Sequence, residues 1–211
     1  MKPKRIFLVR HGESEGNVDG TVYSRIPDHK ISLTGKGRTQ AVSAGEIIKS
    51  TIGIESVQFY VSPHARTRQT FDGIAKAFSP GQYVKYEEPR LREQEWGHLR
   101  SAAETEELQK LRYQYGTFYF RIPNGESGAD GYDRVSTFLE TMFRDFQKED
   151  FADNVVIVSH GLTIRLFVMR WFHSSVEDFE SWRNPYNCEI YVMKQNENGK
   201  YELDRPMAKE N

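Results

Sequence analysis

The sequence has little cysteine and no long apolar run. Its 211 residues include one cysteine, Cys188, which cannot form an internal disulfide and fits a reducing compartment. No apolar run approaches the length of a membrane-spanning helix, and the first five residues enter a strand without the apolar stretch of a signal peptide. We therefore expect a cytoplasmic protein, with a nuclear pool as an alternative, and no membrane insertion.

The sequence also lacks a charge imbalance. It has 29 lysine and arginine residues and 30 aspartate and glutamate residues, for a net charge of -1. A chain with so little net charge has no overall electrostatic field to attract nucleic acid. The sequence also lacks the patterns of RNP motifs, zinc fingers and basic helices, so we expect no nucleic-acid binding. Without a CxxC motif or a histidine pair at helical spacing, we expect no metal and no cofactor. Any attraction for an anion must be local.

Short apolar strands alternate with helical patterns along the chain. Aromatic residues make up 13% of the sequence, which argues against disorder. We predict strands at 6–9, 57–61, 84–87, 155–158, 189–194 and 201–203. We predict helices at 34–48, 63–78 (with Pro63 in its first turn), 105–115, 132–147 and 163–172. The alternation predicts one α/β domain over residues 1–211, with a mostly parallel central sheet and helices on both faces.

Three of the predicted strands end in side chains that suit an anionic ligand. Arg10 and His11 follow the first strand, His160 follows the strand at 155–158, and Arg66 comes soon after the strand at 57–61. The carboxyl ends of parallel strands meet at one edge of a sheet, where ligands bind. A guanidinium beside an imidazole nucleophile suits phosphate esters. The sequence therefore predicts a phosphoryl-transfer site at this edge.

Residues 10–17 (RHGESEGN) resemble the signature of the histidine phosphatase superfamily, in the branch with cofactor-dependent phosphoglycerate mutases and related phosphatases. Further blocks of the family follow in order: Leu33-Thr34-Gly35, Ser62-Pro63 with Arg66, Leu91-Arg92-Glu93, and Ser159-His160-Gly161. The resemblance covers most of the chain. It implies a three-layer α/β/α fold of the phosphoglycerate mutase type, with a specificity insert around residues 93–130.

The resemblance implies a role for each matching residue. His11 is the expected nucleophile, which becomes a phosphohistidine, and Glu93 is the acid that protonates the leaving oxygen and then activates water. The residues expected to bind the phosphoryl group are Arg10, Asn17, Arg66, His160 and Gly161. The implied chemistry is metal-independent, and the implied partner is a small phosphorylated metabolite.

The sequence favours hydrolysis over mutase chemistry. Mutases of this family carry a tyrosine shortly after the acid, a lysine beyond it and an adjacent arginine pair, whereas this chain has Trp96 at the tyrosine position and no arginine pair. We therefore expect a broad-range phosphatase for small phosphomonoesters. The alternatives are a cofactor-dependent phosphoglycerate mutase, with Arg100 or Arg121 binding a carboxylate, and a non-catalytic phosphate-recognition module.

Three features stay open at this point. The oligomeric state is undetermined, and a homodimer is one alternative. Residues 205–211 either are disordered or fold over the pocket as a lid. The aromatic residues between 113 and 120 either line a substrate entrance or pack in a core or interface.

Overall fold

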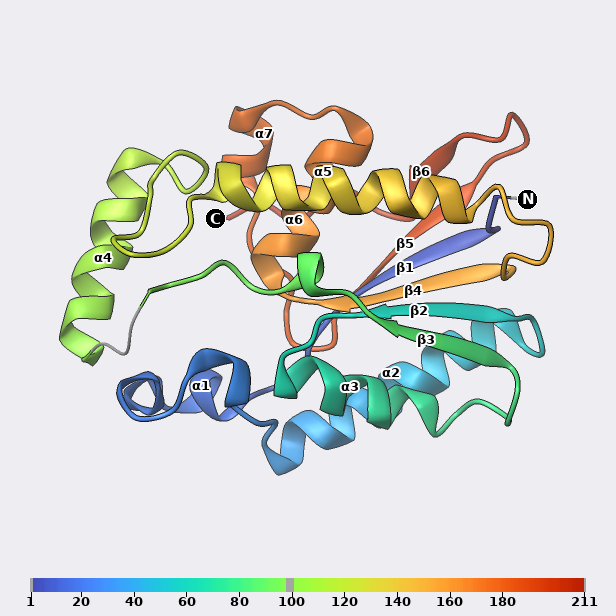
Figure 1. Cartoon of the computed structure of the whole chain (residues 1–211), viewed down its shortest axis with the longest axis horizontal. Coiled ribbons are helices and arrows are strands. Elements are labelled where there is room, and N and C mark those ends of the chain that lie inside the picture. The colour runs from blue at the N-terminus through green and yellow to red at the C-terminus, as the bar shows by residue number, and fades with distance from the viewer. Residues whose placement is uncertain (1, 98–100, 211) are drawn as a thin grey trace.

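The computed structural model describes residues 2–97 and 101–210. Its centre is a six-stranded sheet with the strand order β3-β2-β4-β1-β5-β6 (Figure 1). The first four strands in this order are parallel, and β5 and β6 are antiparallel additions at one side. The strands are β1 (Arg5–Arg10), β2 (Val57–Val61), β3 (Tyr83–Glu87), β4 (Asn154–Ser159), β5 (Ile190–Gln195) and β6 (Tyr201–Leu203). The predicted, mostly parallel sheet is therefore confirmed.

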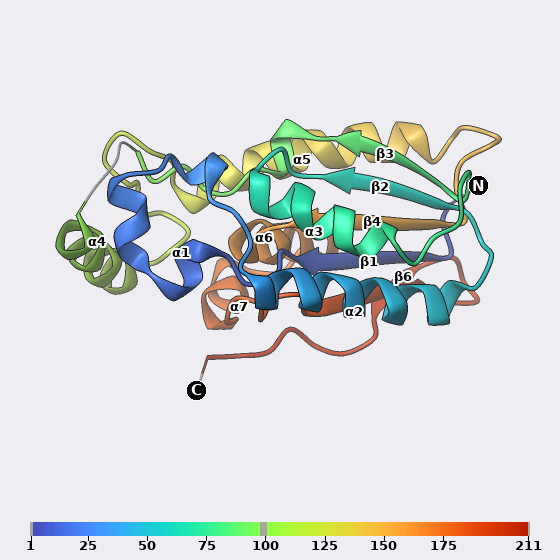
Figure 2. The same cartoon turned by 90° about the horizontal axis from the view of Figure 1, so that it is seen from below.

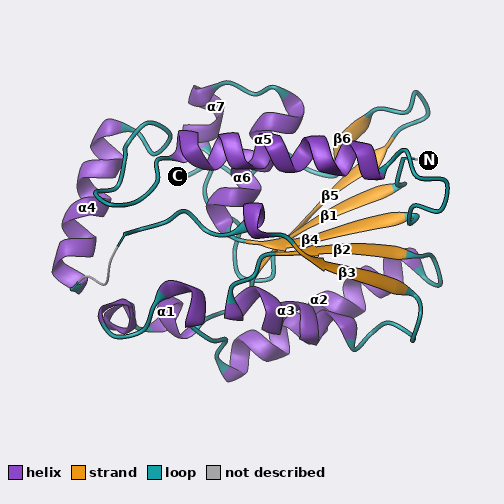
Figure 3. Cartoon of the chain, in the orientation of Figure 1, coloured by secondary structure: helices purple, strands orange, loops and turns teal. Residues whose placement is uncertain are grey.

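Helices cover both faces of this sheet, as predicted (Figure 3). The α-helices are α1 (Glu15–Val18), α2 (Gly35–Ile52), α3 (Ala65–Ala75), α4 (Ala102–Tyr115), α5 (Gly128–Asp145), α6 (Gly161–Phe172) and α7 (Val176–Ser181). Three short 3-10 helices complete the set: η1 (Gly20–Ser24), η2 (Asp28–Lys30) and η3 (Pro89–Leu91). In the part of the chain described, none of the helices combines the length and hydropathy needed to cross a bilayer.

The side chains of β1 show how the three layers are held together. Ile6 and Leu8 pack in one apolar cluster with α5 and α6, whereas Phe7 and Val9 pack in a second cluster with α2 and α3. All four are at most 1% exposed. A strand covered on both faces must be apolar at every position, which explains the continuous run in the sequence. β4 has the same property and lies between β1 and β2.

Several helix boundaries differ from the predictions for identifiable reasons. α4 and α5 begin three to four residues earlier than expected, because Ser101 and Ser127 form capping boxes with Glu104 and Asp130. The prediction that Pro63 lies in the first turn of α3 is wrong. His64 is the extended N-cap residue, so the helix starts at the next residue.

The described tail residues 205–210 pack against the body of the protein. Arg205 forms an ion pair with Glu189 at 3.2 Å, and Met207 is 5% exposed. Lys209 forms an isolated β-bridge with Trp182. None of these tail residues lines the main cavity. Residues 205–210 are therefore ordered against the body of the protein in this structure and do not cover the pocket.

Candidate active site

The site is built at the carboxyl ends of β1, β4 and β2. Arg10 at the end of β1 is in register with Ser159 at the end of β4, and the His11 N–H donates to the Ser159 carbonyl at 3.0 Å. The Ser62 N–H, just after β2, donates to the Val158 carbonyl at 3.0 Å. Figure 2 shows that these strands point toward the end of the molecule that carries α1 and α4. Sheet register therefore brings three distant segments together.

His11 is a buried, neutral imidazole with one free nitrogen. Its side chain is 3% exposed, and Nδ1 lies 2.8 Å from the Gly12 carbonyl oxygen. Nδ1 therefore carries the proton and donates it, which leaves the Nε2 lone pair available. Burial, followed by the charges of Arg66 and Arg10, holds the pKa of His11 well below its usual value. The imidazole is thus prepared to act as a nucleophile.

Two guanidinium groups beside His11 are held by different partners. Arg66 on α3 is 3% exposed and binds both carboxylate oxygens of Asp28, at 2.8 and 3.1 Å. Burial lowers the pKa of Arg66, but this ion pair more than offsets that effect and raises it. Arg10 donates from Nη1 to the Pro185 carbonyl at 2.6 Å. Both side chains are therefore oriented before any ligand binds.

A second histidine lies directly behind the first. His160 is fully buried, and its ring centroid is 5.3 Å from that of His11. Its Nε2 lies 2.8 Å from the Ser62 hydroxyl, whereas Nδ1 has no hydrogen-bond partner among the described residues and is 3.7 Å from Glu93 Oε2. If Ser62 donates to Nε2, the neutral ring carries its proton on Nδ1, the nitrogen beside the Glu93 carboxyl group.

Glu93 supplies a carboxyl group beside these cations. Burial raises the pKa of Glu93, and the nearby charge of Arg66 opposes this rise without reversing it. A carboxyl group with a raised pKa holds its proton closer to neutral pH, as a general acid requires.

These groups meet at a cavity of about 650 Å³. Of the predicted site residues, Arg10, His11, Asn17, Arg66 and Glu93 line the cavity. His160 and Gly161 are buried and do not line it. Gly161 starts α6, where a Cβ would lie within 3.0 Å of the Asn184 side chain. The structure therefore places five predicted residues on the wall and the other two behind it.

Comparison with known proteins identifies the family. Residues 6–205 match the model of the histidine phosphatase superfamily (branch 1). The chain belongs to this superfamily. It is 46% identical over 216 residues to the phosphoglycerate mutase-like protein AT74 of Arabidopsis thaliana, covering 96% of this chain and 68% of that protein. It is 32% identical to the broad-range acid phosphatase DET1 of Saccharomyces cerevisiae, covering 93% and 86%.

A solved structure confirms the fold of this superfamily member. The mycobacterial glucosyl-3-phosphoglycerate phosphatase superimposes with a TM-score of 0.73 at 20% sequence identity, covering 97% of this chain and 99% of that chain. The recognised family and the three-layer α/β fold are thus both confirmed. Its named relatives support an enzyme of the phosphatase or mutase type.

One residue that the sequence did not point to holds the loop that carries His11 in place. Asn187, in the loop before β5, donates from Nδ2 to the His11 carbonyl at 3.1 Å and to Asn17 Oδ1 at 3.0 Å. Asn17 Oδ1 also accepts from the Ser14 N–H at 3.1 Å. With Oδ1 occupied, the Asn17 amide has its NH₂ group left for a ligand. Asn187 is thus a positioning residue.

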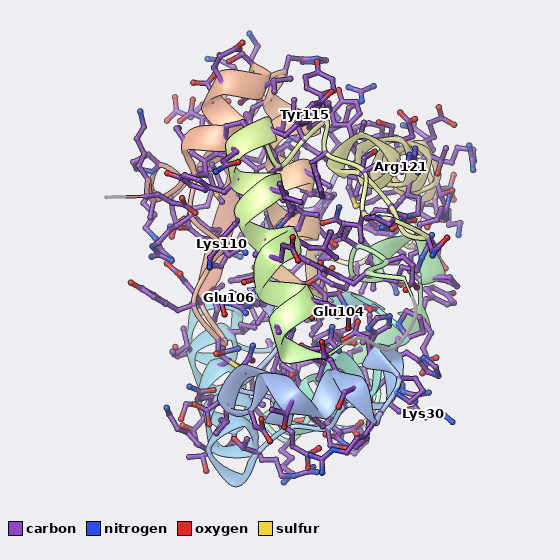
Figure 4. The ribbon with its side chains drawn as sticks, turned by 90° about the vertical axis from the view of Figure 1, so that its left-hand side faces the viewer. Lys30, Glu104, Glu106, Lys110, Tyr115 and Arg121 are labelled. Carbon is purple, nitrogen blue, oxygen red and sulfur yellow. The ribbon has the colours of Figure 1, made fainter. Side chains whose placement is uncertain are left out.

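The outer wall of the cavity comes from η1, to which the sequence assigned no role, and from the expected specificity insert. Tyr23 of η1 and Trp96 line it, together with residues of α4, which packs against η1. Figure 4 shows α4 lying across this end of the molecule, with Glu106 and Lys110 one turn apart along it. The Arg112 guanidinium lies 5.2 Å from the centroid of the Trp96 ring. The expected specificity insert therefore includes part of the cavity wall.

Other expected contributors lie elsewhere. Arg121 forms an ion pair with Asp130 at 2.8 Å and does not line the cavity. Arg100 lies outside the described residues. In the aromatic stretch, Phe118 is a core residue, whereas Tyr113 and Tyr119 are 80% and 61% exposed. None of the aromatic residues between 113 and 120 lines the cavity, so they do not form its entrance.

Proposed function

We propose that this protein is a phosphatase that hydrolyses small phosphomonoesters through a phosphohistidine on His11. The observation that carries the proposal is the arrangement at one cavity. A neutral imidazole with a free Nε2, two oriented guanidiniums and a carboxyl group of raised pKa face the same space. Such a set suits phosphoryl transfer without a metal ion, because the guanidiniums supply the positive charge.

In the first half of the proposed reaction, the phosphoryl group passes from the substrate to the enzyme. Arg10, Arg66 and the Asn17 amide bind its oxygens, while His160 lies behind the wall with its ring against that of His11. His11 Nε2 attacks phosphorus, the bond from phosphorus to the ester oxygen breaks, and Glu93 gives its proton to that oxygen. Removal of one such donor typically costs ~2.7–4 kcal/mol of transition-state stabilisation.

In the second half, water takes the phosphoryl group from His11. The Glu93 carboxylate, now without its proton, accepts a proton from the attacking water. The bond between nitrogen and phosphorus breaks, inorganic phosphate leaves, and both side chains return to their starting states. The same carboxyl group thus serves as acid and then as base.

Hydrolysis rather than mutase chemistry is supported by one relative and by the ion pair of a candidate carboxylate-binding arginine. One relative is named as a broad-range acid phosphatase. In this chain Arg121, a residue considered for carboxylate binding, is instead paired with Asp130. We infer that the substrate is a small phosphorylated metabolite and that the product is inorganic phosphate.

The test is to incubate the purified protein with p-nitrophenyl phosphate and, separately, with 3-phosphoglycerate. We expect release of inorganic phosphate, no effect of a chelator, and loss of turnover in His11→Ala. Interconversion of phosphoglycerates that depends on bisphosphoglycerate, with little phosphate release, would show a mutase instead. Binding of phosphate esters without turnover of any of them would show a recognition module.

A further inference from the structure

We propose that the cavity favours substrates whose leaving group is an uncharged polyol or sugar, and disfavours those that carry a carboxylate or a second phosphate. This inference rests on the proposed phosphatase function and specifies its substrate class. It comes from the distribution of charge along the cavity wall, which differs between the phosphate end and the far end.

The cationic side chains that line the described part of the wall lie at the phosphate end. Among the lining residues that the structure describes, the arginines are Arg10 and Arg66, and no lysine is present. Arg66 already shares its charge with Asp28, which also lines the cavity. The imidazoles of His29 and His64 lie at this end too, since His29 follows Asp28 in the chain and His64 Nδ1 is 3.5 Å from the Asp28 carboxylate. One bound phosphate group therefore engages both lining arginines and leaves neither for a second anion.

The far end of the wall is acidic and polar. Glu95 lines it, accepts a hydrogen bond from the Gly97 N–H at 3.1 Å, and forms no ion pair within the described chain. Glu106 lines it from α4 and is paired with Lys110 at 2.8 Å. Thr105 and Gln109, at i and i+4 of the same helix, lie on one face and add a hydroxyl and an amide. The oxygens of these groups accept hydrogen bonds from hydroxyls, and the Glu95 carboxylate, unpaired within the described chain, repels a second anion.

Trp96 and the size of the cavity match such a leaving group. The indole lines the cavity, and the Arg112 guanidinium covers part of its ring. An aromatic ring offers an apolar surface for the C–H face of a sugar, while its neighbours bind the hydroxyls. A cavity of about 650 Å³ lies in the range that holds small molecules.

Two substrates that differ in a single group test this inference. Glycerol 3-phosphate carries CH₂OH where 3-phosphoglycerate carries a carboxylate. We expect kcat/KM to be about threefold higher for glycerol 3-phosphate, because the substrate carboxylate would lie near Glu95, whereas Lys110 offsets the charge of Glu106. Glu95→Gln should reduce the ratio of kcat/KM for glycerol 3-phosphate to kcat/KM for 3-phosphoglycerate about threefold. Glu197→Gln, an exposed residue in the turn between β5 and β6, is the matched control and should change neither.

Binding to the His11→Ala protein, measured by titration calorimetry, makes the same comparison without turnover. Tighter binding of glycerol 3-phosphate supports the inference, even if the wild-type protein hydrolyses neither compound and the proposed function fails. Equal or tighter binding of 3-phosphoglycerate, or equal kcat/KM values for the two substrates, would overturn it. An unchanged ratio of the two kcat/KM values in Glu95→Gln would also count against it.

Discussion

Replacing Asn187 with aspartate should slow catalysis without removing a group that contacts the substrate. The Asn187 NH₂ group donates to the His11 carbonyl and to Asn17 Oδ1, at 3.1 and 3.0 Å. In Asn187→Asp, a carboxylate oxygen faces these two acceptors. Loss of two hydrogen bonds costs ~2 kcal/mol, and repulsion between the oxygens adds to that cost. We expect kcat/KM for p-nitrophenyl phosphate to fall by roughly 30- to 150-fold.

The assay compares this variant with Asn198→Asp, which makes the same charge change at an exposed position in the turn before β6. The control should keep wild-type kcat and KM. Asn187→Ala removes the donors without adding a charge, so its loss should be smaller than that of Asn187→Asp. If Asn187→Asp folds normally and stays within threefold of the wild-type kcat/KM, the positioning role is refuted.

Two further predictions concern Glu93 and His64. Glu93→Gln should release one p-nitrophenolate per active site in a fast burst and then turn over slowly. The burst is expected because an aryl leaving group needs no general acid, and the slow phase because the attacking water needs a general base. A linear stopped-flow trace would contradict this prediction. Burial, followed by Arg66, lowers the pKa of His64 from 6.5 to about 4. The unfolded chain therefore takes up a proton first as the pH falls. The free energy of unfolding should drop by up to ~3 kcal/mol as the pH falls from 6.5 to 4. This drop should be smaller in His64→Gln. Equal drops for the two proteins in urea titrations would refute the prediction.

The phosphate end of the site was predictable because it depends on strand ends. Runs such as residues 155–158 are apolar at every position, so they had to be buried in a sheet. Parallel strands then deliver whatever follows them to one edge, and here that brings His11 and His160 within 5.3 Å of each other, centroid to centroid. No knowledge of the loops was needed for this result.

Residues that act through tertiary contacts were not predictable. A buried arginine such as Arg66 requires an anion, but any of 30 acidic residues could have supplied it, and the structure selects Asp28. Asn187 donates to a backbone carbonyl, and because every residue has one, the sequence does not identify the partner. The predictable signal that went unused was local: Ser101 and Glu104 have capping-box spacing, and they set the start of α4.

The account depends on a covalent phosphoryl group on His11, and Glu93→Gln offers the means to trap it. The variant is mixed with p-nitrophenyl phosphate, quenched in alkali, which preserves phosphohistidine, and analysed by peptide mass spectrometry. The proposed mechanism predicts one phosphoryl group on the peptide that contains His11, and none in the double variant His11→Ala/Glu93→Gln. Phosphorylation of His160 instead, or wild-type turnover by His11→Ala, would contradict it.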